Sequence, residues 1–134
     1  MGQEKIGAVN EEVVKALGAF GGGIAASGGT CGILIGGVAL ASSLYSRGNI
    51  EGKEDPRMWS MSAKFAKQFE KLSKPFGGIQ CRDIAGVNWH DRAAVKSYYS
   101  APDSRRQICI KLVGDAAYAL GVILEEENQD SENK

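Results

Sequence analysis

The longest apolar run in the sequence is Ile33-Leu34-Ile35-Gly36-Gly37-Val38-Ala39-Leu40-Ala41. Its residues do not alternate between apolar and polar side chains, as those of a half-buried strand would. Thr30 precedes the run and is a candidate helix N-cap, because its hydroxyl can accept a backbone N–H of the first turn. The stretch therefore predicts a central helix over residues 31 to about 46, covered by its neighbours on most sides.

Helical patterns also occur on both sides of this central helix. Asn10 is a candidate N-cap for a short helix over residues 10–20, which the glycines at positions 21–23 end. Asp55 and Pro56 are expected to begin a longer helix, because aspartate is a common N-cap and proline fits the first helical position. One face of that helix is apolar and consists of Met58, Met61, Phe65, Phe69, Leu72 and Phe76.

The last third of the chain predicts a short helix over residues 81–85, and a further helix or an irregular segment over residues 89–99. A final helix is expected to begin at Asp103 or Ser104 and to run to about Glu126, with a buried stripe of Cys109, Leu112, Val113, Ala116, Leu120 and Ile123. No segment shows the alternation of a strand. We therefore predict a single all-α domain over residues 1–134, with about five helices around the central apolar, glycine-rich helix. Residues 1–9 and 127–134 are expected to be flexible termini.

The overall composition excludes several classes of function. Sixteen basic and sixteen acidic side chains cancel, so no strong net charge favours nucleic acid or an anionic membrane as a partner. The apolar run at residues 33–41 is shorter than the roughly 20 residues of a membrane span, and the first residues lack the apolar core of a secretory signal. An odd count of three cysteines does not suit a disulfide-stapled secreted domain. We expect a cytoplasmic protein that binds neither membrane nor nucleic acid.

Glycines form a second pattern within the central helix. Gly32 and Gly36 lie one turn apart and would present a flat stripe on which another backbone can approach closely. The stripe can serve tight packing inside one domain, which is the common use of such a stripe. It can also form the seam of a homodimer, and we keep both interpretations.

The cysteines are the main candidates for chemistry. Cys31 and Cys81 each follow a glycine-rich stretch and are expected at the start of a helix, where backbone N–H groups and the helix dipole favour a thiolate. Cys109 lies on the predicted buried stripe of the last helix. His90 is the sole histidine and is a possible fourth ligand. The spacing of the cysteines fits no local zinc or ferredoxin pattern, and each cysteine can also be a small buried apolar residue.

Five segments resemble a known family of redox-active proteins that is named for its C-GCAxxG-C-C pattern, one of them the aromatic, basic helix over residues 65–74. The likeness covers roughly residues 11–125, and the cysteine domain of split-Soret cytochromes is similar to the same pattern. The other segments that carry the likeness are Phe20-Gly21-Gly22-Gly23-Ile24, Thr30-Cys31-Gly32-Ile33-Leu34-Ile35-Gly36-Gly37, Phe76-Gly77-Gly78-Ile79-Gln80-Cys81-Arg82-Asp83-Ile84, and the helix with Cys109 before Leu112-Val113.

The resemblance implies a small helical protein whose cysteines converge on a redox or iron–sulfur site. On this basis Cys31, Cys81 and Cys109 are the expected metal ligands, and Gly29, Thr30 and Gly32 are the expected contacts of the bound cofactor. The family usually has a further cysteine on a helix ahead of the glycine-rich segment, and this sequence has none there. His90, an external ligand or a partner subunit would have to complete a four-ligand site.

Three hypotheses of function follow. The first is a redox protein in which the three cysteines bind an iron–sulfur cluster or another thiophilic metal for electron transfer to a redox partner that the sequence does not name. The second is metal-free thiol chemistry with a reversible Cys31–Cys81 disulfide, and the third is a structural or interaction module with inert cysteines. The sequence leaves open whether the protein is an enzyme. A shared metal site predicts that the sulfurs of Cys31 and Cys81 lie within roughly 4 to 7 Å.

Overall fold

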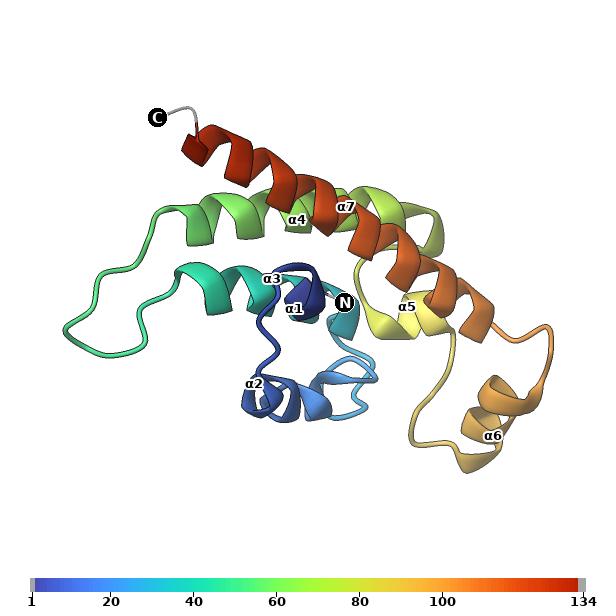
Figure 1. Ribbon diagram of the computed structural model, residues 1–134. Helices are drawn as coiled ribbons and strands as arrows, with labels where there is room; N and C mark the ends of the chain where they lie inside the picture. The colour runs from blue at the N-terminus through green and yellow to red at the C-terminus, as the bar shows by residue number, and fades with distance from the viewer. Residues whose placement is uncertain (1, 133–134) are drawn as a thin grey trace.

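The computed structural model describes residues 2–132, and these residues form helices and loops without a strand (Figure 1). The all-α prediction is therefore confirmed. Met1 and residues 133–134, which belong to the termini predicted to be flexible, lie outside the described residues. The helices are α1 (Gly2–Lys5), α2 (Glu11–Ala16), η1 (Gly18–Phe20), α3 (Gly32–Tyr45), α4 (Arg57–Ser73), η2 (Lys74–Phe76), α5 (Cys81–Ala85), α6 (Arg92–Ser100) and α7 (Arg106–Glu132), where η denotes a 3₁₀ helix.

Helices α3, α4 and α7 pack together and enclose the hydrophobic core. In Figure 1, α7 crosses over α4, α3 lies beneath them, and α5 and α6 are gathered at one end. The most completely buried large side chains come from α4 and α5: Met61, Phe65, Phe69 and Ile84. Each such side chain contributes roughly 1.5–3 kcal/mol when it leaves water. The core therefore rests mainly on the apolar face of α4 that the sequence predicts.

The start of α4 shows how local chemistry positions this face. The helix begins at Arg57, and the carboxylate of Asp55 accepts the backbone N–H of Arg57 at 2.9 Å. The Arg57 guanidinium also hydrogen-bonds the Asp55 carboxylate, and both contacts lower the pKa of Asp55 to about 2. The predicted capping role of Asp55 is thus present, one residue farther from the helix than expected, because Pro56 occupies the N-cap position.

The start of α3 differs from the sequence prediction. Thr30 does not cap this helix. Cys31 holds the N-cap position without a side-chain capping bond, and Thr30 instead pairs with Gln80 in an isolated antiparallel β-bridge. The extended backbone that pairs with Gln80 takes Thr30 away from the first turn, so its hydroxyl is not the acceptor we expected.

The glycines of α3 have three different environments. Gly37 is the position of closest approach, because a Cβ atom there would lie 2.0 Å from Cε1 of Phe65. Gly32 lies against Phe20 of η1, whose carbonyl oxygen would be 3.0 Å from an added Cβ, and Gly36 faces open space. Gly36 lines an apolar cavity of about 440 Å³ between α2, α3 and α7. Packing inside the chain therefore uses Gly37 and Gly32, and a homodimer through Gly32 and Gly36 stays a prediction.

Helix α7 extends beyond its expected end at about Glu126 and reaches Glu132. Ion pairs hold this last part, since Glu125 binds Lys5 of α1 and Glu127 binds Lys64 of α4. On its buried stripe one residue was predicted wrongly: Val113 is 41% exposed, because it faces the open cavity beside Gly36. The flexibility of the termini stays a prediction, although residues 2–5 form a helical turn against α3 and α7.

One helix within residues 2–132 is long and apolar enough to cross a membrane by length and composition, over Arg106–Asp130. A core helix of a soluble protein passes the same test, and several residues of α7 belong to the hydrophobic core. Length alone therefore does not assign this helix to a membrane.

Candidate functional site

The glycine-rich segment before α3 forms a left-handed turn. Gly22, Gly23, Ile24, Ala25 and Ala26 all have positive φ, from 51° to 78°. Such a conformation costs roughly 1–2 kcal/mol for each residue that carries a Cβ atom. Backbone hydrogen bonds across the turn hold it in place, including one from the N–H of Ala25 to the carbonyl of Ala19 at 2.7 Å. This strained turn immediately precedes the segment in which Thr30 forms its β-bridge with Gln80.

The β-bridge joins the segments that precede α3 and α5. The N–H of Cys31 donates to the carbonyl of Ile79 at 2.9 Å, and the N–H of Cys81 donates to the carbonyl of Gly29 at 2.6 Å. Successive side chains along an extended backbone point to opposite sides. Since Cys31 and Cys81 both follow the bridged pair by one residue, their side chains leave the bridge on the same side.

Cys31 is almost completely buried, with 7% of its surface exposed. Burial raises the pKa of its thiol, and the neighbouring charges of Cys81 and Cys109 raise it further. The backbone N–H groups of Ile33 and Leu34 face the sulfur and lower the thiol pKa, against the effect of burial. In the free protein burial prevails, so this cysteine is a neutral thiol, yet two amides already face its sulfur.

Cys81 and Cys109 lie in a second, smaller apolar cluster together with Trp89 and Tyr98. Burial raises the pKa of Cys81, and the indole N–H of Trp89 opposes this shift. The Tyr98 hydroxyl approaches the Cys109 sulfur, and burial together with this proximity raises the pKa of Tyr98. Cys109 packs against both apolar clusters, of which one contains Cys31 and the other contains Cys81.

The three cysteines come together at one end of the molecule. Each one is close enough to the other two for their charges to raise a pKa, and all three are free thiols. No group of three or more His, Cys, Asp or Glu side chains within the described part of the chain forms a site for a single metal ion. Two thiols beside the bridge and a third from α7 thus lie in an apolar environment. They lie farther apart than the ligands of a single metal ion would.

A family model for a "Putative redox-active protein (C_GCAxxG_C_C)" matches residues 1–123 of the chain. The chain belongs to this family. The resemblance seen in the sequence is therefore confirmed, and the description of the family is that of redox-active proteins. Among curated proteins and among solved structures, no match is found.

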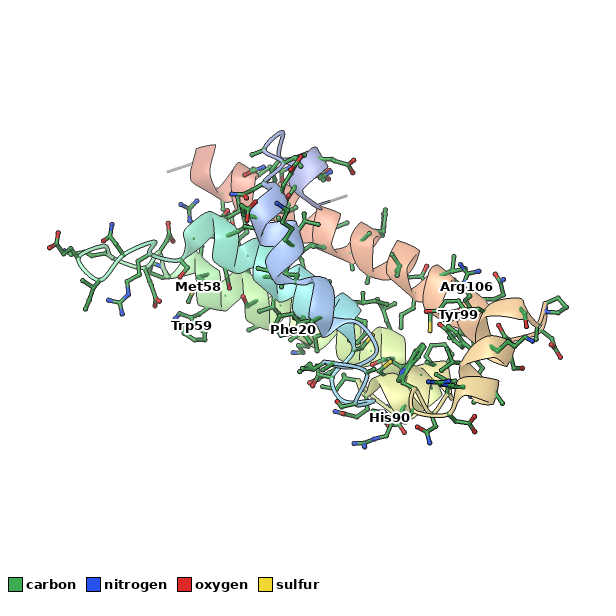
Figure 2. The ribbon with its side chains drawn as sticks, turned by 90° about the horizontal axis from the view of Figure 1, so that it is seen from below. Phe20, Met58, Trp59, His90, Tyr99 and Arg106 are labelled. Carbon is green, nitrogen blue, oxygen red and sulfur yellow. The ribbon has the colours of Figure 1, made fainter. Side chains whose placement is uncertain are left out.

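The structure places the other predicted site residues at different distances from the thiols. His90 is exposed and lines a cavity of about 470 Å³ with Arg82 and Trp89, and no cysteine lines this cavity. Figure 2 shows His90 at the edge of the molecule. The carbonyl of Gly29 accepts the hydrogen bond from the backbone N–H of Cys81 and so positions this cysteine. Gly32 packs against Phe20. A direct contact of Gly29, Thr30 or Gly32 with a cofactor stays a prediction, as does ligation by His90.

Two residues of the site were not predicted from the sequence. Trp89 and Tyr98 lie in or beside the helix that we expected over residues 89–99, and their rings meet edge to face with centroids 5.1 Å apart. The only sequence signal was their position, ahead of Cys109 in a segment with few other large apolar residues. Their proximity to the sulfurs follows from the fold of the loop before α6, which no local pattern specifies.

Proposed function

We propose that the protein is an electron-transfer protein in which Cys31, Cys81 and Cys109 hold an iron–sulfur cluster. The observation that carries this proposal is the meeting of all three free thiols, two of them on the same side of the bridge between residues 30 and 80. When bound, such a cluster takes up and releases single electrons at a potential that its surroundings set. The protein's own groups bind the cluster, exclude water and stabilise its charge.

The bridge geometry favours ligation over a disulfide between Cys31 and Cys81. Cys31 lies opposite Ile79 in the bridge, so Cys81 is its diagonal neighbour. Diagonal neighbours of an antiparallel pair have Cα atoms about 7–8 Å apart. A disulfide needs a Cα separation below about 7 Å, and a wider pair would close only if the backbone moved. Ligands of a cluster can bind different iron atoms and therefore stay apart.

The donor set also favours a cluster over a single thiophilic ion. Three thiols influence one another, but none of the described side chains forms a three-ligand group around one ion. A cluster spans a larger volume than a single ion and accepts more widely spaced thiolates. Three cysteines leave one ligand position to His90, an external ligand or a partner subunit.

The surroundings of the thiols suit a bound anion. The backbone N–H groups of Ile33 and Leu34 at the start of α3 face the Cys31 sulfur, and the positive end of the helix dipole lies there as well. The apolar residues around Cys31 and Cys81 keep water away from both sulfurs. Binding of iron would release the thiol protons and replace them with metal–sulfur bonds.

Anaerobic reconstitution with ferrous iron and sulfide tests this proposal. Wild-type protein should acquire bound iron, inorganic sulfide and visible charge-transfer absorption. Serine at any one of the three cysteine positions should lower the iron content, and serine at all three should abolish it. Circular dichroism of each variant checks that the helices are retained. Colourless, iron-free wild-type protein from such a preparation contradicts the proposal.

The same preparation separates the two other hypotheses. A count of free thiols after mild oxidation should remain three if no disulfide forms, and a loss of two thiols that dithiothreitol restores would favour the disulfide. Triple Cys→Ala protein that keeps both its stability and its cellular function would favour inert cysteines.

A further inference from the structure

One polar atom near the thiols has no partner in the free protein. The indole nitrogen of Trp89 is buried, and it makes no hydrogen bond with any described atom. Buried donors are almost always paired, because an unpaired donor loses its bond to water without a replacement. An orphaned N–H at this place therefore requires an explanation.

The candidate hydrogen-bond acceptor for this donor is the sulfur of Cys81. Trp89 packs in the same apolar cluster as Cys81, and its N–H is close enough to lower the pKa of that thiol. A neutral thiol is a weak acceptor, whereas a thiolate accepts hydrogen bonds strongly because it carries charge. Loss of the thiol proton on metal binding would turn Cys81 into the acceptor that Trp89 lacks.

Tyr98 packs beside Trp89 in the same apolar cluster and approaches a different cysteine. Its ring meets Trp89 edge to face, and it packs in the same apolar cluster as Cys109, whose sulfur its hydroxyl approaches. The two aromatic side chains thus bring one N–H donor and one O–H donor to two different cysteines.

We propose that Trp89 and Tyr98 are positioning residues that donate hydrogen bonds to the sulfurs of Cys81 and Cys109 when these bind the cluster. The inference rests on the proposed function. Donors to the sulfurs of a cluster stabilise its more reduced, more negative state and so raise its reduction potential. The free protein holds the Trp89 donor unsatisfied, and the loaded protein satisfies it.

This arrangement predicts opposite effects of one substitution in the two states. Trp89→Phe keeps an aromatic ring and removes the orphaned donor. The metal-free variant should therefore unfold at the same temperature as the wild type or higher. The loaded variant should hold iron less tightly against a competing chelator, by roughly 10-fold, and its midpoint potential should move to more negative values.

Matched controls lie elsewhere on the surface. Trp59 is 68% exposed and lies far from His90 in Figure 2, and Tyr118 on α7 is also exposed. Trp59→Phe and Tyr118→Phe should leave unfolding temperature, iron retention and potential unchanged. Tyr98→Phe should shift the potential in the same direction as Trp89→Phe.

The outcomes separate this inference from the proposed function. Wild-type protein that stays colourless after reconstitution overturns the proposed function and with it this inference. A coloured wild type whose Trp89→Phe and Tyr98→Phe variants keep its potential and iron retention overturns the inference alone. A Trp89→Phe protein that is destabilised without metal and unchanged in its cluster would show that the ring only packs.

Discussion

The bundle of α3, α4 and α7 and the cysteine end of the molecule contribute to the stability of the fold with opposite sign. In the bundle, apolar side chains meet at close range, as Phe65 does over the bare backbone of Gly37. At the cysteine end, the chain accepts a left-handed turn at residues 22–26 and an unpaired donor at Trp89. Packing in the bundle therefore stabilises the fold, and it offsets the free-energy cost of the strained turn and the unpaired donor at the cysteine end. Substitutions in the two regions should therefore differ in sign as well as in size.

The largest effect is expected where the bundle is tightest. Gly37→Ala places a Cβ atom 2.0 Å from the Phe65 ring and should destabilise the protein by about 1–3 kcal/mol, because the helices must move apart. Gly36→Ala is the matched control in the same helix. No atom lies within 4 Å of its added Cβ, so it should stabilise the helix by up to about 1 kcal/mol.

Urea unfolding measures both glycine variants. Equal effects at positions 36 and 37 would show that the close contact of α3 with α4 is absent. A dimer that dissociates only in Gly36→Ala, measured by sedimentation, would instead support the homodimer through the glycine stripe.

An Ala→Gly substitution should change the stability in opposite directions in the left-handed turn and in an ordinary right-handed helix. Ala25→Gly removes the Cβ atom from a residue with φ of 51° and should stabilise the fold by about 1 kcal/mol. Ala63→Gly in α4 is the control, because Ala63 is exposed within a right-handed helix. It should cost about 1 kcal/mol. Thermal unfolding of the two variants decides the comparison, and a loss of stability in both would refute the strain at residue 25.

An intermediate effect is expected at the ion pair between α4 and α7. Nζ of Lys64 lies 2.7 Å from Oε1 of Glu127, and the Glu127 side chain is only 8% exposed. Lys64→Gln should cost up to about 1 kcal/mol, since the lysine is half exposed and water screens much of the attraction. Lys67→Gln, on the exposed side of the same helix, should be neutral. A chemical unfolding series at low and high salt measures the difference, which should shrink as salt rises.

The smallest effect concerns pH in the metal-free protein. The thiol pKa values of Cys31 and Cys81 are raised above their ordinary value of 9.0, mainly by burial. The folded state therefore holds these protons more tightly than the unfolded state. The stability that this difference provides is complete below pH 9 and is lost as pH rises through the folded pKa. Cys31→Ala should flatten the decline of unfolding free energy above pH 9, and an unchanged slope would contradict the raised pKa.

The sequence predicted the helices best where apolar spacing decides them. The face of α4 with Met58, Met61, Phe65 and Phe69 followed directly from helical periodicity. The caps Asn10 and Asp91 also lie where their side chains accept the first amides of α2 and α6, and the sequence indicated the first of these. Such features depend only on neighbours in the chain.

Features that depend on distant segments were not predictable in this way. Thr30 has the chemistry of a cap, but pairing with Gln80 takes it out of the helix. The choice of Gly37 for the close contact depends on how α4 crosses α3. Three residues with side chains in a left-handed turn contradict local preference, so only tertiary contacts explain them. For the same reason the sequence indicated the three cysteines but not the donors Trp89 and Tyr98.

The bridge between Thr30 and Gln80 also has a consequence for the order of folding. It joins residues about 50 positions apart, and closing so long a loop directly costs chain entropy. Pairing of α3 with α4 shortens that loop first, because both helices lie between the bridged residues. We therefore expect the thiols of Cys31 and Cys81 to come together late, after α3 and α4 have paired. Conversely, the amide hydrogens of Cys31 and Cys81 should exchange with solvent through a local opening while those of α4 remain protected.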